Sequence, residues 1–336
     1  MKIEELLWHL EKTADPASAA EWDACGIQVR GAASDVHRLA VTLDPTPQRV
    51  REAVDNGADF ILTHHPLSLN PSLPSADDAY TAVLRILFQS GCWLYAAHTS
   101  LDVCIHGPPA WLARNLGLKN VSALAPLQNR PQPCLRARLS CRLEAELAER
   151  LTADPSVQFV QNPEHENSEV IMGADAAGRL ERLLKDKADI HWMERIELLP
   201  EVTEERGFGL IGDLEPAVSW NELTSRLGEE LSLERTTRVG HVSEPVTRLA
   251  YCPGSGMSLA ARAFDRGAQV FISGDLKYHQ AQELEPLGLV LDVGHFILEE
   301  EMMRHWTQDL SKQLQDRDIR ITFFPGHNPL RSESLA

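Results

Sequence analysis

The chain has 336 residues and a formal net charge of −17, a length that suits two or three domains. Its hydrophobic fraction of 43% and charged fraction of 24% are typical of an ordinary globular protein. The acidic balance and the absence of a dense Lys/Arg run argue against general nucleic-acid binding. No stretch approaches the roughly 20 apolar residues of a membrane span, and the acidic first residues lack a signal-peptide core. We therefore expect a cytoplasmic protein without membrane or nucleic-acid partners.

Residues 38–64 are predicted to form a strand, a helix and a second strand. Apolar runs at 39–43 and 58–62 have strand length, and Pro47 between them suits the first turn of a helix. A further helix and a strand are expected before residue 98. A strand–helix–strand unit of this kind predicts a parallel, buried sheet and an α/β fold.

Residues 128–205 have a different pattern. The predicted order β-α-β-β-α-β indicates a ferredoxin-like α+β domain, and prolines mark both of its borders. We therefore expect three regions: a first α/β half at 1–127, an inserted ferredoxin-like domain at 128–205, and a second α/β half at 206–336.

The pattern of residues 38–64 returns at 248–274 with a constant offset of 210. Seven positions are identical without a gap. The next strands also correspond, since Leu94–His98 resembles Leu291–His295. Convergent α/β patterning could produce such a match, but the constant offset favours a true pseudo-repeat. The fold is then predicted to have two similar α/β halves built around a common centre.

Two adjacent histidines follow a strand of the first half. Parallel sheets place ligands at the carboxyl ends of their strands, and His64 and His65 fall at such an end. Pro66 keeps His65 out of helical geometry, and neighbouring side chains on extended chain point to opposite sides. The pair could therefore address two metal ions. A purely structural role for a histidine at a strand end is the alternative.

Two histidine–carboxylate pairs share a spacing of four residues: His98 with Asp102, and His295 with Glu299. On a helix such residues lie on one face, and nitrogen and oxygen ligands together suit Zn²⁺, Fe²⁺ or Mn²⁺. Helix capping by a neighbouring hydroxyl is a competing explanation for the first pair. Each pair ends the equivalent strand of its half, which suggests two half-sites that face each other. With the adjacent histidines they would form a dinuclear centre bridged by one carboxylate.

A further polar segment, Gly274–His279, occupies the place of the histidine pair in the second half. Asp275, Lys277 and His279 could bind substrate, orient ligands or transfer protons. A loop of ordinary polar residues would look much the same.

Together, these motifs resemble the Nif-three-like dinuclear metal-centre family, whose members are often labelled GTP cyclohydrolase 1 type 2 homologues. The resemblance covers about residues 1–125 and 206–330. It rests on five ordered motifs: Trp22–Ile27, Thr63–Pro66, His98–Asp102, Gly274–His279 and Asp292–Glu299. Ala24, Pro253 and the segment around Pro108 depart from the residues usual in the family, at places where a substrate would be recognised.

The resemblance implies a two-metal site with His98 beside the ligands, which are His64, His65, Asp102, His295 and Glu299. It also implies ring-like hexamers, and an inserted domain is found in some longer members of the family.

The functional hypothesis is a hydrolase that uses two divalent ions, zinc, iron or manganese, and acts on a small substrate of the nucleotide kind. Glu299 would bridge the ions, and His98 or His279 would carry protons. The alternative is a non-catalytic metal-binding scaffold or regulator whose insert senses a ligand. A structural metal that clamps the two halves together is a third hypothesis.

Overall fold

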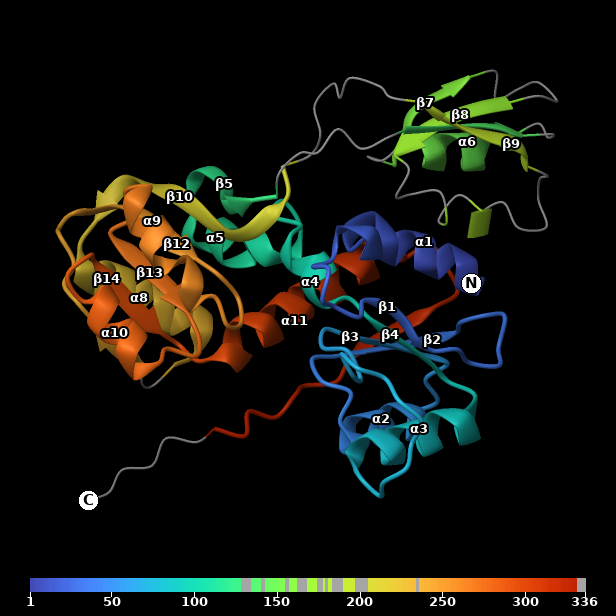
Figure 1. The fold of residues 1–336 in the computed structure, drawn as a ribbon, viewed down its shortest axis with the longest axis horizontal. Helices are drawn as coiled ribbons and strands as arrows, with labels where there is room; N and C mark the ends of the chain where they lie inside the picture. Colours follow the sequence, from blue (N-terminus) through green and yellow to red (C-terminus); the bar gives the residue numbers. More distant parts are fainter. Residues whose placement is uncertain are drawn as a thin grey trace. The chain divides into compact units, whose positions relative to one another are not determined.

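The computed structural model describes residues 1–127, 134–139, 143–154, 157–161, 168–173, 178, 181–182, 190–196, 205–233 and 236–330. Internal contacts divide the chain into two compact units (Figure 1). One unit combines residues 1–18 with 128–204, and the other combines 19–127 with 205–336. Within the described part of the chain, no helix is both long and apolar enough to cross a membrane.

The larger unit contains a five-stranded sheet in the order β1-β4-β3-β2-β15. β2, β3, β4 and β15 run parallel, and β1 pairs with β4 in the antiparallel sense. The strands are β1 (Gly26–Val29), β2 (Arg38–Thr42), β3 (Phe60–Thr63), β4 (Trp93–Ala96) and β15 (Arg320–Phe323). The parallel core agrees with the sheet expected from the sequence.

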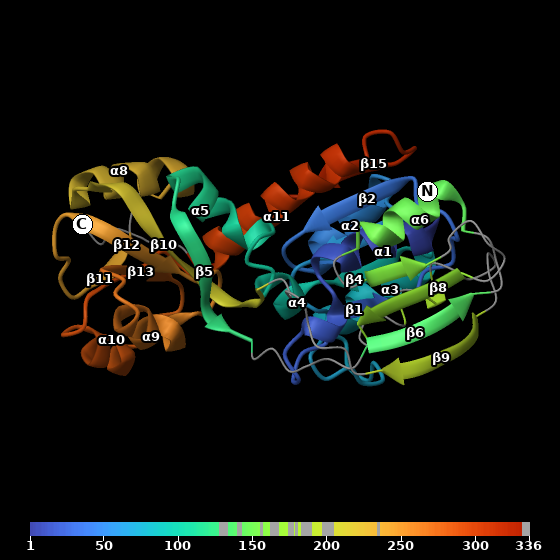
Figure 2. The ribbon, with the colours of Figure 1, turned by 90° about the horizontal axis from the view of Figure 1, so that it is seen from above.

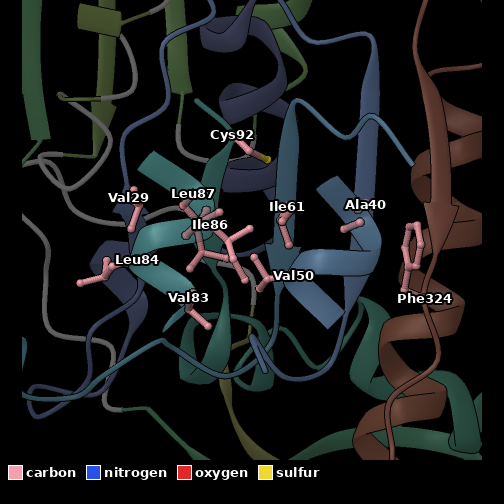
Figure 3. Close-up of a cluster of buried hydrophobic side chains, with 12 residues drawn as sticks. Val29, Ala40, Val50, Ile61, Val83, Leu84, Ile86, Leu87, Cys92 and Phe324 are labelled. Carbon is pink, nitrogen blue, oxygen red and sulfur yellow. The ribbon is translucent and has the colours of Figure 1, made fainter. Parts of the chain in front are cut away.

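Two helices, α2 (Pro47–Asp55) and α3 (Ala79–Ser90), pack on this sheet. Thr46 caps α2 by accepting a hydrogen bond from the Arg49 N–H, and Gly57 takes a positive φ just beyond the helix, where glycine is favoured. Apolar side chains from both helices meet those of the strands in one buried cluster (Figure 3). This core holds the strand ends in fixed positions.

A second sheet in the same unit has six strands in the order β11-β14-β13-β12-β10-β5. Its strands β10, β12 and β13 are labelled in Figure 2. Its strands are β5 (Lys119–Pro126), β10 (Gly207–Val218), β11 (Thr237–Val239), β12 (Val246–Tyr251), β13 (Val270–Ser273) and β14 (Leu289–Asp292). The accompanying helices are α4 (His98–Asp102), α5 (Trp111–Leu116), α8 (Trp220–Leu231), α9 (Ala260–Asp265), α10 (Tyr278–Leu284) and α11 (His295–Gln313). α11 connects the two sheets, because it contacts α8 as well as β2 and β15.

The strand register confirms the pseudo-repeat. Leu39 pairs with Phe60 in the first sheet, and Leu249 pairs with Val270 in the second, so both partners keep the offset of 210. Each half also has an antiparallel edge strand beside its last parallel strand, β1 in one and β11 in the other. The mixed α/β fold with two similar halves therefore follows the sequence-based expectation.

The predicted alignment of the last strands of the two halves is wrong by one residue. Thr63 pairs with Ala96 and Ser273 with Asp292, so the last strands correspond at an offset of 196 rather than 197. The structural counterpart of His98 is therefore Gly294, and His295 comes one residue later. Both counterparts have a positive φ, 26° at His98 and 86° at Gly294. The sequence alignment paired His98 with His295 because both are histidines, although their backbone positions in the two halves differ by one residue.

The smaller unit has a four-stranded antiparallel sheet in the order β7-β8-β6-β9. Its elements are α1 (Ile3–Thr13), β6 (Cys134–Leu139), α6 (Ala145–Thr152), β7 (Val157–Gln161), β8 (Ser168–Gly173) and β9 (Ile190–Ile196). Trp8 of α1 belongs to the same buried cluster as Leu147 and Leu151 of α6. The second helix of the expected ferredoxin-like pattern falls largely outside the described residues. The ferredoxin-like assignment and the three-region division of the chain stay predictions.

Candidate metal centre

The two adjacent histidines follow β3 in a hydrogen-bonded turn. The backbone N–H groups of His64 and His65 both donate to the carbonyl of Leu43, at 3.1 Å each. The Thr63 hydroxyl donates to the His65 carbonyl at 2.8 Å. These bonds fix the backbone beyond the carboxyl end of the strand, so both imidazoles leave a rigid element.

His64 is completely buried, and neither of its ring nitrogens has a hydrogen-bond partner among the described residues. Its Nε2 lies 3.5 Å from Glu299 Oε1 and 3.7 Å from Asp102 Oδ1. Burial lowers the pKa of His64 because the charged imidazolium loses its solvation. The ring therefore faces two carboxylates, and a shift in this direction favours the neutral imidazole, the form in which histidine binds a metal ion.

His65 is held from one side by a carboxylate. Its Nδ1 lies 2.7 Å from Asp44 Oδ1, and its Nε2 lies 3.2 Å from Glu299 Oε2. Burial alone would lower the pKa of His65, but the carboxylates of Asp44 and Glu299 raise it to about 10. Asp44 therefore fixes the ring so that Nε2 is directed at Glu299.

His295 repeats this arrangement at the first residue of α11. Its Nδ1 lies 2.7 Å from Asp275 Oδ2, and its Nε2 lies 3.1 Å from Glu299 Oε2. The hydrogen bond with Glu299 raises the pKa of His295, burial lowers it, and Asp275 raises it further, so that it reaches about 9. The spacing of four residues within the helix thus brings His295 and Glu299 together, as the sequence predicted.

His98 is the third imidazole with a carboxylate behind it. Its Nδ1 lies 2.8 Å from Asp23 Oδ1. Asp23 also accepts hydrogen bonds from Thr99 and from the Cys25 thiol. Burial alone would raise the pKa of Asp23, but these hydrogen bonds hold it far below its usual range. His98 keeps its left-handed backbone, a conformation that costs energy in a non-glycine residue, so the surrounding contacts must hold it there.

The side chains form two groups whose ligand atoms all lie within 4.8 Å of one another. One group contains His64, His65 and His98, and the other contains His65, His295 and Glu299. Each group could hold a metal ion. The expectation that His64 and His65 each face a metal ion of their own remains a prediction.

Comparison with known proteins agrees with this arrangement of motifs. The family model for Duf34/NIF3 (NGG1p interacting factor 3) matches residues 1–329. The chain belongs to the DUF34/NIF3 family.

Two curated relatives show how far this similarity extends. The "GTP cyclohydrolase 1 type 2 homolog" of Staphylococcus aureus strain Mu50 is 25% identical over 329 residues, which cover 88% of this chain and 89% of the relative. The protein of the same name from Staphylococcus epidermidis strain RP62A is 26% identical over 331 residues, with the same coverage.

Solved structures with similar sequences share the fold. A Bacillus cereus protein related to NIF3 superposes with a TM-score of 0.72 at 23% identity and covers 100% of this chain and 99% of its own. Reduced HcgD from Methanocaldococcus jannaschii gives a TM-score of 0.64 at 22% identity, with coverage of 96% and 97%. At these identities the likeness establishes the DUF34/NIF3 fold alone.

The buried acids of this DUF34/NIF3 protein fit a cation. Asp102 Oδ1 is buried without a hydrogen-bond partner among the described residues, an expensive state for a carboxylate oxygen. Burial and then the charge of Glu299 raise the pKa of Asp102 to about 8. Burial would also raise the pKa of Glu299, but His64, His295 and His65 hold it well below its usual value. A bound dication would supply the positive charge that would let Asp102 ionise beside Glu299.

A glycine, Gly254, lies directly against the Glu299 carboxylate and leaves room for it. Gly254 has a φ of +64°, and a Cβ at this position would lie 2.0 Å from Glu299 Oε1. Only glycine therefore fits beside the buried carboxylate. The Gly254 carbonyl accepts a hydrogen bond from the Gly274 N–H at 2.9 Å, which ties this turn to the end of β13.

His279 and Lys277 lie outside both groups. His279 is exposed, with its ring against Tyr278 and its Nδ1 3.4 Å from Gln282 Oε1. Lys277 is exposed at the start of α10. Asp275 of the same segment reaches His295, which matches the ligand-orienting role considered for it from the sequence.

Sequence reasoning missed the roles of Asp23 and Asp44. Asp44 directly follows Leu43 beyond the carboxyl end of β2, so the rule that drew attention to His64 would also have found it. Asp23 belongs to a recognised motif, but it is far from His98 in the chain. No local pattern indicates that the two side chains meet.

Proposed function

We propose that this protein is a hydrolase that depends on two divalent metal ions, zinc, iron or manganese, and acts on a small substrate of the nucleotide kind. The observation that carries the proposal is one constellation of side chains. Asp23, Asp44 and Asp275 each hold the Nδ1 of a different imidazole, next to the buried polar atoms of His64, Asp102 and Glu299.

In this proposal five side chains are ligands. His64, Asp102 and Glu299 would hold one ion, and His65, His295 and Glu299 would hold the other. Glu299 is the natural shared ligand, because its two oxygens lie 3.1 to 3.5 Å from nitrogens of three different imidazoles. Carboxylates behind metal-binding histidines fix the ring tautomer and strengthen the ligand, and this is the arrangement of His65 and His295.

The bound ions would supply Lewis acidity, which makes water acidic enough to act as a nucleophile near neutral pH. The protein's own residues would position and protonate the reactants. We assign proton transfer to His98, whose ring lies in the first group and is only 17% exposed. Asp23 stays ionised behind it and stabilises the imidazolium that forms when His98 takes up a proton. His279 is the alternative proton carrier. Its ring is exposed and lies outside both groups of side chains, so we assign it the smaller role.

The substrate class is inferred from the name of the curated relatives. Their printed name refers to a GTP cyclohydrolase. A cyclohydrolase-like or phosphoesterase-like reaction would suit a site that combines carboxylates, imidazoles and metal ions. Ala24 and Pro253 depart from the family's usual residues close to Asp23 and Gly254, so we expect a substrate preference that differs from the family's.

A second candidate is a non-catalytic metal-binding scaffold or regulator. It is favoured by the smaller unit, which has its own sheet and its own buried cluster and contains none of the proposed ligands. In that case the metal centre would organise a homo-oligomer, a hexameric ring by family resemblance, and the smaller unit would sense a ligand.

The test compares the purified chain loaded with zinc, iron or manganese against the same chain after chelation and against Glu299→Gln. Nucleotides, cyclic amides and phosphoesters are offered as substrates. The proposal expects turnover of at least one class that the chelated protein and the variant both lose. If a chain with two ions turns over none of them but metal loading sets its oligomeric state in light scattering, the scaffold is the better account.

A further inference from the structure

A pair of arginines lies at the amino ends of two parallel strands of the first sheet, the opposite ends from the metal centre. Arg38 opens β2 and Arg320 opens the edge strand β15, and the two are direct partners in the register. Both side chains are exposed, and both line a small pocket of about 70 Å³. The other lining residues are Leu39, Ala40, Ala53, Asn56, Ala58, Thr322 and Phe324.

Like charges on paired strand positions repel each other, and the described residues do little to offset this pair. Arg38 donates from Nη1 to the Asn56 carbonyl at 2.8 Å, and no ion pair joins either guanidinium to a carboxylate of the described chain. The Asp59 carboxylate contacts the backbone of this segment and not a guanidinium group. Its Oδ2 accepts hydrogen bonds from the backbone N–H groups of His37 and Arg38. Positive charge is therefore left over at this point of an acidic protein.

The pseudo-repeat provides an internal comparison. Arg248, the counterpart of Arg38 at the offset of 210, makes the same backbone contact, from Nη1 to the Arg266 carbonyl at 3.2 Å. Its strand partner, however, is Asp213, and Nε donates to Asp213 Oδ1 at 2.7 Å. The Arg248 hydrogen bond, together with one from Asn120, lowers the pKa of Asp213. The second half therefore supplies an internal carboxylate where the first half presents a second arginine.

We propose that Arg38 and Arg320 form a binding site for a small dianionic oxyanion, namely phosphate or the phosphate group of a phosphomonoester. The anion would take the place next to Arg38 that the Asp213 carboxylate takes next to Arg248. Guanidinium groups bind such oxygens through paired, charge-assisted hydrogen bonds, and the Thr322 hydroxyl can add a donor. A pocket of about 70 Å³ has the volume of roughly two water molecules, so it admits a phosphate group but not a nucleoside.

This site is separate from the metal centre, and the inference does not depend on the proposed function. The metal-binding groups lie beyond the carboxyl ends of the parallel strands, whereas Arg38 and Arg320 are the first residues of theirs. Binding here would tie the edge strand β15 to β2 and so stabilise the folded chain.

The test follows the thermal unfolding of the full-length, metal-loaded protein as inorganic phosphate replaces chloride at constant ionic strength. We expect a saturable rise of the midpoint in the wild type and phosphate binding at least about tenfold weaker in Arg320→Asp. This variant gives Arg38 the internal carboxylate that Arg248 already has, so it should also be more stable than the wild type without phosphate. Arg320→Gln serves as a second variant if the aspartate disturbs folding.

Arg51→Asp is the matched control, because Arg51 is exposed on α2, lies outside the pocket lining and gives the same change of charge. It should keep the wild-type phosphate response. Phosphate bound at the metal ions would stabilise all variants equally, so an equal response of wild type and Arg320→Asp would overturn the proposal. Acetate is titrated in parallel, and a response to acetate as strong as that to phosphate would overturn the assignment to a dianion.

Discussion

Asp44 lies behind His65 at 2.7 Å from its Nδ1, and Asp275 and Asp23 do the same for His295 and His98. Each carboxylate engages the Nδ1 atom of one imidazole, which fixes the orientation of the ring and leaves Nε2 for another partner. The three acids come from distant parts of the sequence, so their common role is visible only in the fold.

Asp44→Asn should weaken metal binding by roughly 10- to 100-fold, the usual cost of losing a carboxylate behind a histidine ligand. The amide cannot supply the negative charge that favours the Nδ1–H form of His65. Competition titration with a chelator measures the affinity. Asp77→Asn is the control, because Asp77 is an exposed acid that pairs with Arg85. An unchanged affinity in Asp44→Asn would mean that Asp44 does not position His65.

Gly254→Ala should reduce the metal content of the protein and lower its stability. The new Cβ would lie 2.0 Å from Glu299 Oε1, so the buried carboxylate must move, and a left-handed alanine costs a further ~1–2 kcal/mol. Metal analysis and denaturant unfolding measure the two effects. Gly228→Ala, in a helix with no atom within 4 Å of the added Cβ, should instead stabilise by about 0.5–1 kcal/mol. Full metal content in Gly254→Ala would contradict the proposed position of Glu299.

At the scale of elements, the two histidines of α11 have different surroundings. Its first residue, His295, belongs to the candidate metal centre, whereas His305 further along stacks on Trp111 with ring centroids 5.3 Å apart. Burial, aided by Arg114, lowers the pKa of His305 despite Glu301, Asp309 and Glu230 nearby. The helix therefore holds a half-buried histidine whose surroundings favour the neutral form.

The lowered pKa of His305 predicts a loss of stability in acid. Above the unfolded-state pKa of about 6.5 the residue is neutral in both states and has no effect. As the pH falls below that value, the unfolded chain takes up the proton first, and the folded state loses stability until the lower folded-state pKa is passed. Urea unfolding between pH 7 and 5 should show a steeper loss in the wild type than in His305→Gln. Parallel curves would show that the folded state does not lower the pKa of His305.

The sequence predicted the regular elements of the first half well, because Thr46, Pro47 and Gly57 mark the ends of α2 with local signals. It did not predict β15, a short edge strand that joins the first sheet from the far end of the chain. Nor could it detect the one-residue shift between His98 and His295, since only strand pairing reveals which backbone positions correspond.

For the whole molecule, the constant offset between the halves was the most informative signal in the sequence. It predicted two similar sheets and a site formed by His64, His65, Asp102, His295 and Glu299. The fold brings these side chains near one another, and their role as metal ligands stays a prediction. The aspartates behind the histidines and the arginine pair at the opposite strand ends could not be predicted. Both depend on contacts between segments whose sequences contain no common pattern.

The central claim, a two-metal centre organised around Glu299, is tested most directly by counting metal ions. The chain is purified, loaded with excess zinc, iron or manganese, desalted and analysed by mass spectrometry of the elements. We expect two ions per chain in the wild type, one in Asp102→Ala, and a loss of both in Glu299→Ala because that residue would serve both ions. A wild type that holds fewer than two ions, or a Glu299→Ala variant that keeps both, would contradict the central claim.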